Sequence, residues 1–321
     1  MGRAWRPSQS TKWDVLIRTM RNCMIDGFSD CPVYEQLQYS GGSRAVGLFH
    51  YLLSRDDGLM RQVMINFAAS ATFEGLTQSR FQSHVPQLIT GFSLYWALQV
   101  CDHDLYFGGT QFARSFLPRI DGVLDFFDSH IDRLGLVSGL PDDVWQYVDC
   151  VTTWGATEEY PDKGMPSSGR ISNRHTYCSM LYAYVLQQVA RLVHNIGRPG
   201  YATEYETRAL ALQQAIRAHC YGGRFFTDST ADIADDLSYS QHCQAFAIIS
   251  WTARPDDRAR LLTESFTDPH FSKCSCMMQF CALRALRLAG DEVYESFWPR
   301  LLDSWRKMLA NNLTTWEEVD V

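Results

Sequence analysis

The stretch Leu181-Tyr-Ala-Tyr-Val185-Leu-Gln-Gln-Val189-Ala-Arg-Leu192 repeats an apolar residue every three or four positions. This spacing places the repeated residues along one face of an α-helix. Residues 293–309 show the same pattern, with an apolar residue at every fourth position. Nine further segments are predicted helices: 11–24, 42–54, 58–71, 90–105, 110–133, 200–219, 240–251, 256–265 and 274–289. Strand-like alternation is scarce apart from residues 223–227, so the sequence predicts an all-α fold of stacked antiparallel hairpins.

The 321 residues have the composition of a folded protein, with 46% hydrophobic side chains. No linker rich in Gly, Ser or Pro divides them, and a helical toroid fills this length as one unit. We therefore expect one domain, 1–321. A net charge of −7 argues against a nucleic-acid partner, because such proteins present a basic face. No stretch is typical of a membrane anchor, which leaves a small-molecule substrate as the expected partner.

The ten cysteines do not suggest a disulfide framework, because such frameworks belong to much shorter chains. The first thirteen residues lack the apolar core of a signal peptide, so we expect a reduced, cytoplasmic compartment. The tightest cluster is Cys274, Cys276 and Cys281, without a second pair or nearby histidines, so we expect no metal site there. The phosphate-binding P-loop, the dinucleotide motif G-x-G-x-x-G and the G-x-S-x-G elbow are all missing, and we expect no cofactor.

Two segments interrupt the helical rhythm, residues 26–41 and 134–172. Long irregular loops on a helical scaffold commonly carry function. The first contains Asp26, Asp30 and Glu35 among aromatic and small residues. Carboxylates in such surroundings either separate in pKa and perform acid–base chemistry, or remain solvated and cap helices.

A second acidic segment, Leu-Thr-Thr-Trp-Glu-Glu at 313–318, puts Trp316 beside two carboxylates. On its own it is typical of a frayed, acidic chain end. If the helices close into a ring, however, it becomes a neighbour of the first acidic loop. Opposed carboxylates about 6.5–9.5 Å apart leave room for a water molecule, as inverting glycoside hydrolysis requires.

These two segments resemble the signature of the α-L-rhamnosidases of glycoside hydrolase family 78. The resemblance begins with Asp30-Cys-Pro-x-x-Glu35 and its following Tyr-Ser-Gly, and ends with Leu-Thr-Thr-Trp-x-Glu318. Further similar segments lie between them in order: 75–80, 92–96, 135–137, Trp145-x-x-x-Asp149 and 240–242. The resemblance thus spans nearly the whole chain, and it implies an (α/α)₆ barrel with a pocket at one end of the ring.

The resemblance also implies roles for individual residues. Glu35 matches the general acid and Glu318 the general base that activates water, while Asp30 matches a carboxylate that binds sugar hydroxyls. Asp149 and Trp145 would line the pocket. The remaining residues expected to bind substrate are Arg80, Trp154, His242 and Trp316, the tryptophans because aromatic faces suit the apolar side of a deoxy sugar.

The chain departs from the family pattern at Gly42, where the family has Asp after the glycine that corresponds to Gly41. A sugar-binding carboxylate is therefore missing, and the sequence shows no β-sandwich domain around the barrel. Both differences motivate a second hypothesis, a cyclase or isomerase acting on a small apolar terpenoid or polyketide. A third is a barrel that has lost catalysis and serves as a binding protein.

Overall fold

The protein is described by a computed structural model that covers residues 7–156, 158, 163–230 and 238–311. Its regular structure is helical throughout these residues. The helices are α1 (Pro7–Asn22), α2 (Ser40–Ser54), α3 (Gly58–Ala69), α4 (Thr90–Phe107), α5 (Thr110–Arg114), α6 (Leu117–Ser129), α7 (Ser167–Ser172), α8 (Thr176–Asn195), α9 (Pro199–His219), α10 (Gln241–Ile249), α11 (Arg258–Thr267), α12 (Gln279–Ala289) and α13 (Asp291–Asn311), with short 3₁₀ turns η1 (Thr152–Trp154) and η2 (Pro255–Asp257).

Each of the eleven predicted segments contains a helix, and the all-α prediction is confirmed. The segment 110–133 divides into α5 and α6, because Pro118 at the start of α6 has no N–H to extend a helix from α5. The short helix α7 lies within the segment 134–172, which was expected to be irregular. The strand-like alternation at residues 223–227 does not form a strand, and the structure has only an isolated bridge there, between Tyr221 and Phe226.

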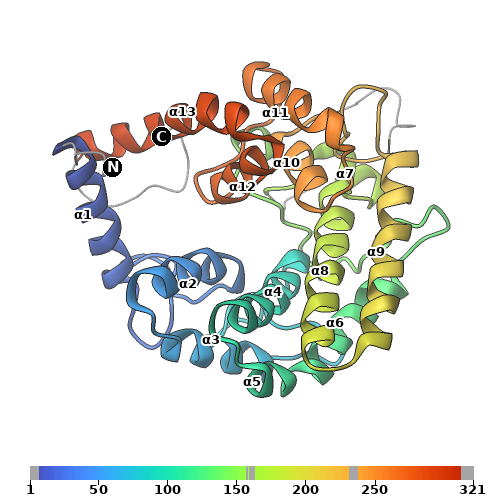
Figure 1. Ribbon diagram of the computed structural model, residues 1–321, viewed down its shortest axis with the longest axis horizontal. Coiled ribbons are helices and arrows are strands. Elements are labelled where there is room, and N and C mark those ends of the chain that lie inside the picture. Colours follow the sequence, from blue (N-terminus) through green and yellow to red (C-terminus); the bar gives the residue numbers. More distant parts are fainter. Residues whose placement is uncertain (1–6, 157, 159–162, 231–237, 312–321) are drawn as a thin grey trace.

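The helices are arranged in a ring of hairpins (Figure 1). Helices α2, α4, α8, α10 and α12 form the inner wall, each packed on the next. Helices α1, α3, α6, α9, α11 and α13 run along the outside, and the contact between α1 and α13 brings the beginning and end of the described chain together. This is the predicted (α/α)₆ architecture, represented in the described residues by six outer and five inner helices.

The inner helices α4 and α8 are buried along most of their length. Trp96 of α4 and Tyr182 of α8 are completely buried. Some of the polar groups inside are paired with one another: Tyr95 and Tyr177 join their hydroxyls at 2.7 Å, and a 2.7 Å ion pair links Arg44 to Asp102. Such pairing offsets the cost of removing polar groups from water.

The inner helices share one direction, because an outer helix returns the chain before each inner helix begins. Their N-termini therefore lie at one end of the ring, together with the long loops that precede them. Helix N-termini carry partial positive charge and favour carboxylates nearby. The predicted site residues Asp30, Glu35, Trp145 and Asp149 all belong to these loops. This end of the ring is consequently where a site is expected.

Candidate active site

The loop that carries Glu35 is folded back on itself by Gln38. The Gln38 side chain accepts the N–H of Phe28 at 3.2 Å and donates to the carbonyl of Phe81 at 3.2 Å. Gly27 is required beneath it, because a Cβ at that position would collide with the Gln38 amide. One side chain thus ties this loop to the neighbouring loop that carries Arg80.

Glu35 lies exposed on the turn of this loop. Its N–H donates to Cys31 Sγ at 2.9 Å, and its carboxylate lies near enough to the Tyr39 hydroxyl for its charge to act on that group. Arg80 Nη1 donates to the same hydroxyl at 3.3 Å. Burial, reinforced by the Glu35 charge, raises the pKa of Tyr39 despite the opposing effect of Arg80, so Tyr39 remains protonated and able to donate. Glu35 is therefore open to solvent and lies near a protonated tyrosine.

Asp30 and Gly42 lie beside one another at the start of α2. The Asp30 N–H is bonded to the carbonyl of Leu37 at 2.8 Å, which fixes the backbone that carries this exposed carboxylate. A Cβ at Gly42 would lie 3.8 Å from Asp30 Oδ1, which is ordinary van der Waals contact. The glycine thus leaves space next to the carboxylate, and the backbone there does not require a glycine.

A row of aromatic rings connects the Glu35 loop with Trp145. Edge-to-face contacts join Tyr39 to Phe92 at 6.2 Å, Phe92 to Tyr147 at 6.2 Å, and Tyr147 to Trp145 at 5.0 Å. Trp145 is half-buried and donates its indole N–H to the carbonyl of Lys163 at 3.0 Å. Trp145 therefore belongs to the same end of the barrel as Glu35, as expected from the sequence.

A second cluster is buried under Trp154. Asp149 Oδ2 pairs with His242 Nε2 at 2.6 Å and accepts the N–H of Ser275 at 2.8 Å, while its Oδ1 accepts the Ser275 hydroxyl at 2.6 Å. Asp149 and His242 are each 1% exposed, and the Trp154 ring lies 4.9 Å from that of His242. Burial would lower the pKa of His242, but Cys274 and Asp149 outweigh it and raise that pKa to about 10. The cluster is thus a charged pair kept away from water.

The predicted site residues therefore separate into two groups. Asp30, Glu35, Arg80 and Gly42, with Trp145 reached through the aromatic row, form an open group at the loop ends. Asp149, Trp154 and His242 form the buried group, in which the Asp149 oxygens are turned toward His242 and Ser275. The other two predicted residues, Trp316 and Glu318, lie outside the described residues.

Three residues that matter to these groups were not predicted: Tyr39, Cys274 and Ser275. Tyr39 stands four positions after Glu35, within the segment already considered catalytic. Cys274 stood out only as part of a cysteine cluster that did not suggest a site, and Ser275 gave no signal, because its partner Asp149 lies far away in the chain. Only the closed ring brings them together.

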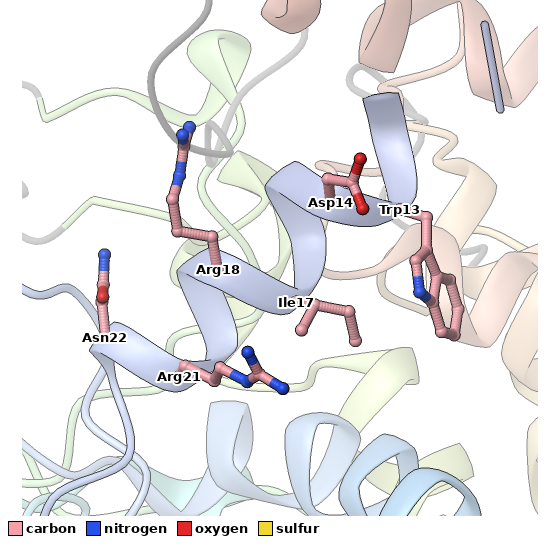
Figure 2. A pocket seen from close by; sticks show the side chains of 6 residues that line it. All are labelled: Trp13, Asp14, Ile17, Arg18, Arg21 and Asn22. Carbon is pink, nitrogen blue, oxygen red and sulfur yellow. The ribbon is translucent and has the colours of Figure 1, made fainter. Parts of the chain in front are cut away.

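The structure also contains surface hollows away from these groups. One of about 390 Å³ lies along α1, and Figure 2 shows the side chains that line it on successive turns of this helix: Trp13, Asp14, Ile17, Arg18, Arg21 and Asn22. Another, of about 280 Å³, is lined by Arg224, Phe225, Glu264, Thr267 and Asp268. Neither includes a predicted site residue.

Within the described residues, His, Cys, Asp and Glu side chains do not gather in threes in a way that would hold a metal ion. The described helices also include none with the length and apolar character needed to cross a bilayer.

Comparison with known families accounts for this architecture. Residues 8–260 match the model of the bacterial alpha-L-rhamnosidase six-hairpin glycosidase domain. The chain belongs to this family. The prediction of a six-hairpin, rhamnosidase-like barrel is thereby confirmed. A search of curated proteins found no match.

Solved rhamnosidases share the fold of this family member. A glycoside hydrolase family 78 rhamnosidase from Bacillus sp. GL1 matches 98% of the chain with a TM-score of 0.84 at 23% identity. A rhamnosidase from Klebsiella oxytoca with rhamnose bound matches 98% with a TM-score of 0.81 at 17% identity. The Streptomyces avermitilis α-L-rhamnosidase complexed with L-rhamnose matches 98% with a TM-score of 0.69 at 15% identity.

The six-hairpin chain spans only part of these relatives. The match covers 32% of the Bacillus protein, 57% of the Klebsiella protein and 28% of the Streptomyces protein. The shared region is the helical barrel, so the likeness establishes the fold.

Proposed function

We propose that this six-hairpin barrel hydrolyses α-L-rhamnosides or closely related glycosides by an inverting mechanism. Glu35 acts as the general acid that protonates the leaving oxygen, and Glu318 acts as the base that activates water. The observation that carries the proposal is the position of Glu35, exposed at the end of the ring where the inner helices begin and near the protonated Tyr39. Two of the structural relatives described above hold rhamnose, which supports a sugar at this end of the barrel.

The proposed reaction needs a proton donor on one side of the sugar and a carboxylate on the other. Glu35 can give its proton to the glycosidic oxygen, because its turn holds the carboxyl group outside the packed core. Asp30 would accept sugar hydroxyls beside Gly42, and the aromatic row ending at Trp145 would support the ring. A base opposite Glu35 would leave room for water, as in other inverting glycosidases.

The test is hydrolysis of phenyl α-L-rhamnoside, whose leaving group needs protonation, by the wild-type chain and by Glu35→Gln. We expect turnover in the wild type and a loss of about 10³-fold or more in the variant, because general acid catalysis alone contributes about 10²–10⁴-fold. Glu74→Gln is a matched control, since Glu74 is an exposed carboxylate on the neighbouring loop, and it should retain full activity.

A panel of sugars and lipophilic compounds completes the experiment. Turnover of phenyl α-L-rhamnoside that is unchanged in Glu35→Gln would refute the assignment of the acid. Conversion of terpenoid or polyketide compounds, with no response to any glycoside, would replace the proposal with a cyclase or isomerase function.

A further inference from the structure

The outer helix α1 has an apolar face that the described residues leave largely uncovered. Trp13 and Leu16 are 49% and 40% exposed, and with Ile17 they occupy positions i, i+3 and i+4, which share one face of a helix. Trp13 and Ile17 also line the hollow of about 390 Å³ along α1 (Figure 2). A contiguous apolar face of this kind marks a surface that another segment covers.

The inner wall beside α1 is formed by α12 and α2, with no helix between them among the described residues (Figure 1). Each of the first five outer helices leads into an inner helix, whereas none follows α13 within this part of the chain. Phe49 of α2 faces α12, because its ring lies 6.0 Å from that of Phe280. Phe49, Leu52 and Leu53 are 48%, 65% and 43% exposed and share one face of α2. Uncovered apolar faces of α1 and α2 thus border the same place in the ring.

Residues 312–321 are the segment of this chain that is placed to cover these faces. They follow α13, which packs against α1, so they begin near the helix that carries the hollow. Ten residues span at most about 33 Å and the 16 residues of α1 span about 24 Å, so the segment is long enough to run along this helix. Its sequence has an apolar residue at every third position: Leu313, Trp316 and Val319.

The hollow and the segment also carry opposite charges. Arg18 and Arg21 line the hollow one turn apart, and the carboxylate among its lining residues is that of Asp14. Arg21 makes no ion pair within the part of the chain that the structure describes. The segment contains Glu317 and Asp320, each directly after one of its apolar residues. Charge complementarity therefore favours binding of the segment along the hollow.

We propose that residues 312–321 bind this face of α1 and close the ring between α12 and α2. The apolar residues of the segment pack against Trp13 and Ile17, and its carboxylates at 317 and 320 pair with the two arginines of the hollow. Glu318 belongs to neither set and stays available for the hydrolysis proposed above. The inference concerns how the ring is closed, so it does not depend on that reaction.

The test is cleavage of the native chain by endoproteinase Glu-C, which cuts after glutamate, followed by mass spectrometry. Glu74 lies exposed in a turn and serves as the internal reference. A bound segment is cut only while it is detached, so we expect cleavage after Glu318 to be at least about tenfold slower than cleavage after Glu74. Equal or faster cleavage after Glu318 would overturn the proposal.

A substitution in the apolar face locates the bound segment. Trp13→Ala should speed cleavage after Glu318 by about tenfold, because a buried aromatic anchor commonly contributes this much to binding. Leu210→Ala is the matched control, since Leu210 is 54% exposed on α9, and it should have no effect. Unchanged cleavage after Glu74 verifies that both variants are folded. No effect of Trp13→Ala, or an equal effect of Leu210→Ala, would overturn the assignment of this face.

Reversal of the charges tests the pairing on one unchanged cleavage site. In a chain that carries Glu317→Arg and Asp320→Arg, cleavage after Glu318 should be fast while Arg21 is present. Adding Arg21→Asp should slow it by about threefold, because exposed ion pairs contribute little each. Cleavage that stays equally fast would contradict the pairing with the hollow.

A second copy of the chain is the other occupant that the experiment detects. Protection by a segment of the same chain is independent of protein concentration, so we expect equal cleavage rates after Glu318 at two concentrations that differ tenfold. Protection that increases with concentration would assign the face to a second copy and overturn the proposal.

Discussion

The two groups of carboxylates at the same end of the barrel differ in how they are held. Glu35 is exposed on a turn, and its carboxylate accepts no side-chain hydrogen bond within the described residues, although its charge acts on the nearby Tyr39 hydroxyl. Asp149 is 1% exposed and has three partner atoms, one on His242 and two on Ser275. The first group can reach a substrate with little rearrangement, whereas the second already uses its polar atoms within the protein.

This difference suits the Glu35 group to catalysis and the Asp149 group to stabilising the fold. An acid must meet the glycosidic oxygen, so exposure suits Glu35. Asp149 joins the loop before η1 to α10 and to the segment before α12, and therefore fastens three parts of the ring at the site. Variants of Asp149 should change stability most, and variants around Glu35 should change activity most.

The largest expected effect on stability is that of Asp149→Ala. The substitution leaves the protonated His242 buried without its carboxylate, and breaking such a buried pair costs about 3–5 kcal/mol. Urea unfolding measures the free energy of unfolding. Glu35→Ala is the control and should change it by less than about 0.5 kcal/mol, as surface substitutions commonly do. Equal losses in both variants would remove the distinction between the two groups.

His175 is a buried histidine without a carboxylate partner, and its pKa is shifted in the opposite direction to that of His242. His175, the residue before α8, is 3% exposed, and neither ring nitrogen has a hydrogen-bond partner among the described residues. Burial, assisted by the charge of Arg170, lowers its pKa from 6.5 to about 4. Between these values the unfolded chain binds the proton and the folded chain does not, so stability falls as the pH falls.

Through His175, the free energy of unfolding should fall by about 2 kcal/mol between pH 7.5 and pH 5, because each unit of pKa shift corresponds to about 1.4 kcal/mol when fully expressed. It is measured as the difference in free energy of unfolding between the wild type and His175→Gln. The wild type should lose stability relative to the variant on acidification. A difference that stays constant across this range would show that His175 titrates normally.

At the open group, Gly42→Asp should strengthen sugar binding. The site has room for the new side chain beside Asp30, and a hydrogen bond to a charged group contributes about 1.5–3 kcal/mol. We expect the KM for an aryl α-L-rhamnoside to fall by about tenfold, consistent with the lower end of that range. Gly42→Ala, which adds volume without a carboxylate, is the control. Improvement by both variants alike would assign the effect to helix stability.

The smallest expected effect is that of Tyr39→Phe, which removes the hydroxyl between Glu35 and Arg80 but keeps the ring against Phe92. Loss of this hydroxyl should lower kcat by about five- to tenfold, equivalent to about 1 kcal/mol. The pH–rate profile should also shift, because the hydroxyl lies near enough to the Glu35 carboxylate for the two groups to influence one another. An unchanged profile would show that Tyr39 only packs.

The open group could be predicted from the sequence, because Asp30, Glu35 and Gly42 lie close together in the chain. The spacing of apolar residues also predicted the long helices, because it places those residues on one face of the helix, and this face is buried along α8. The buried cluster could not be predicted in the same way. His242 and Ser275 meet Asp149 across 93 and 126 residues, and only closure of the ring brings them together.

The role of Glu35 as an acid is tested most directly by varying the leaving group. An acidic leaving group departs without protonation, whereas an alkyl alcohol needs the proton of the acid. Relative to the wild type, Glu35→Gln should therefore be impaired by about 10³-fold or more on an alkyl α-L-rhamnoside, but by less than about tenfold on the 2,4-dinitrophenyl glycoside. Equal impairment on both substrates would contradict the assignment of Glu35 as the general acid.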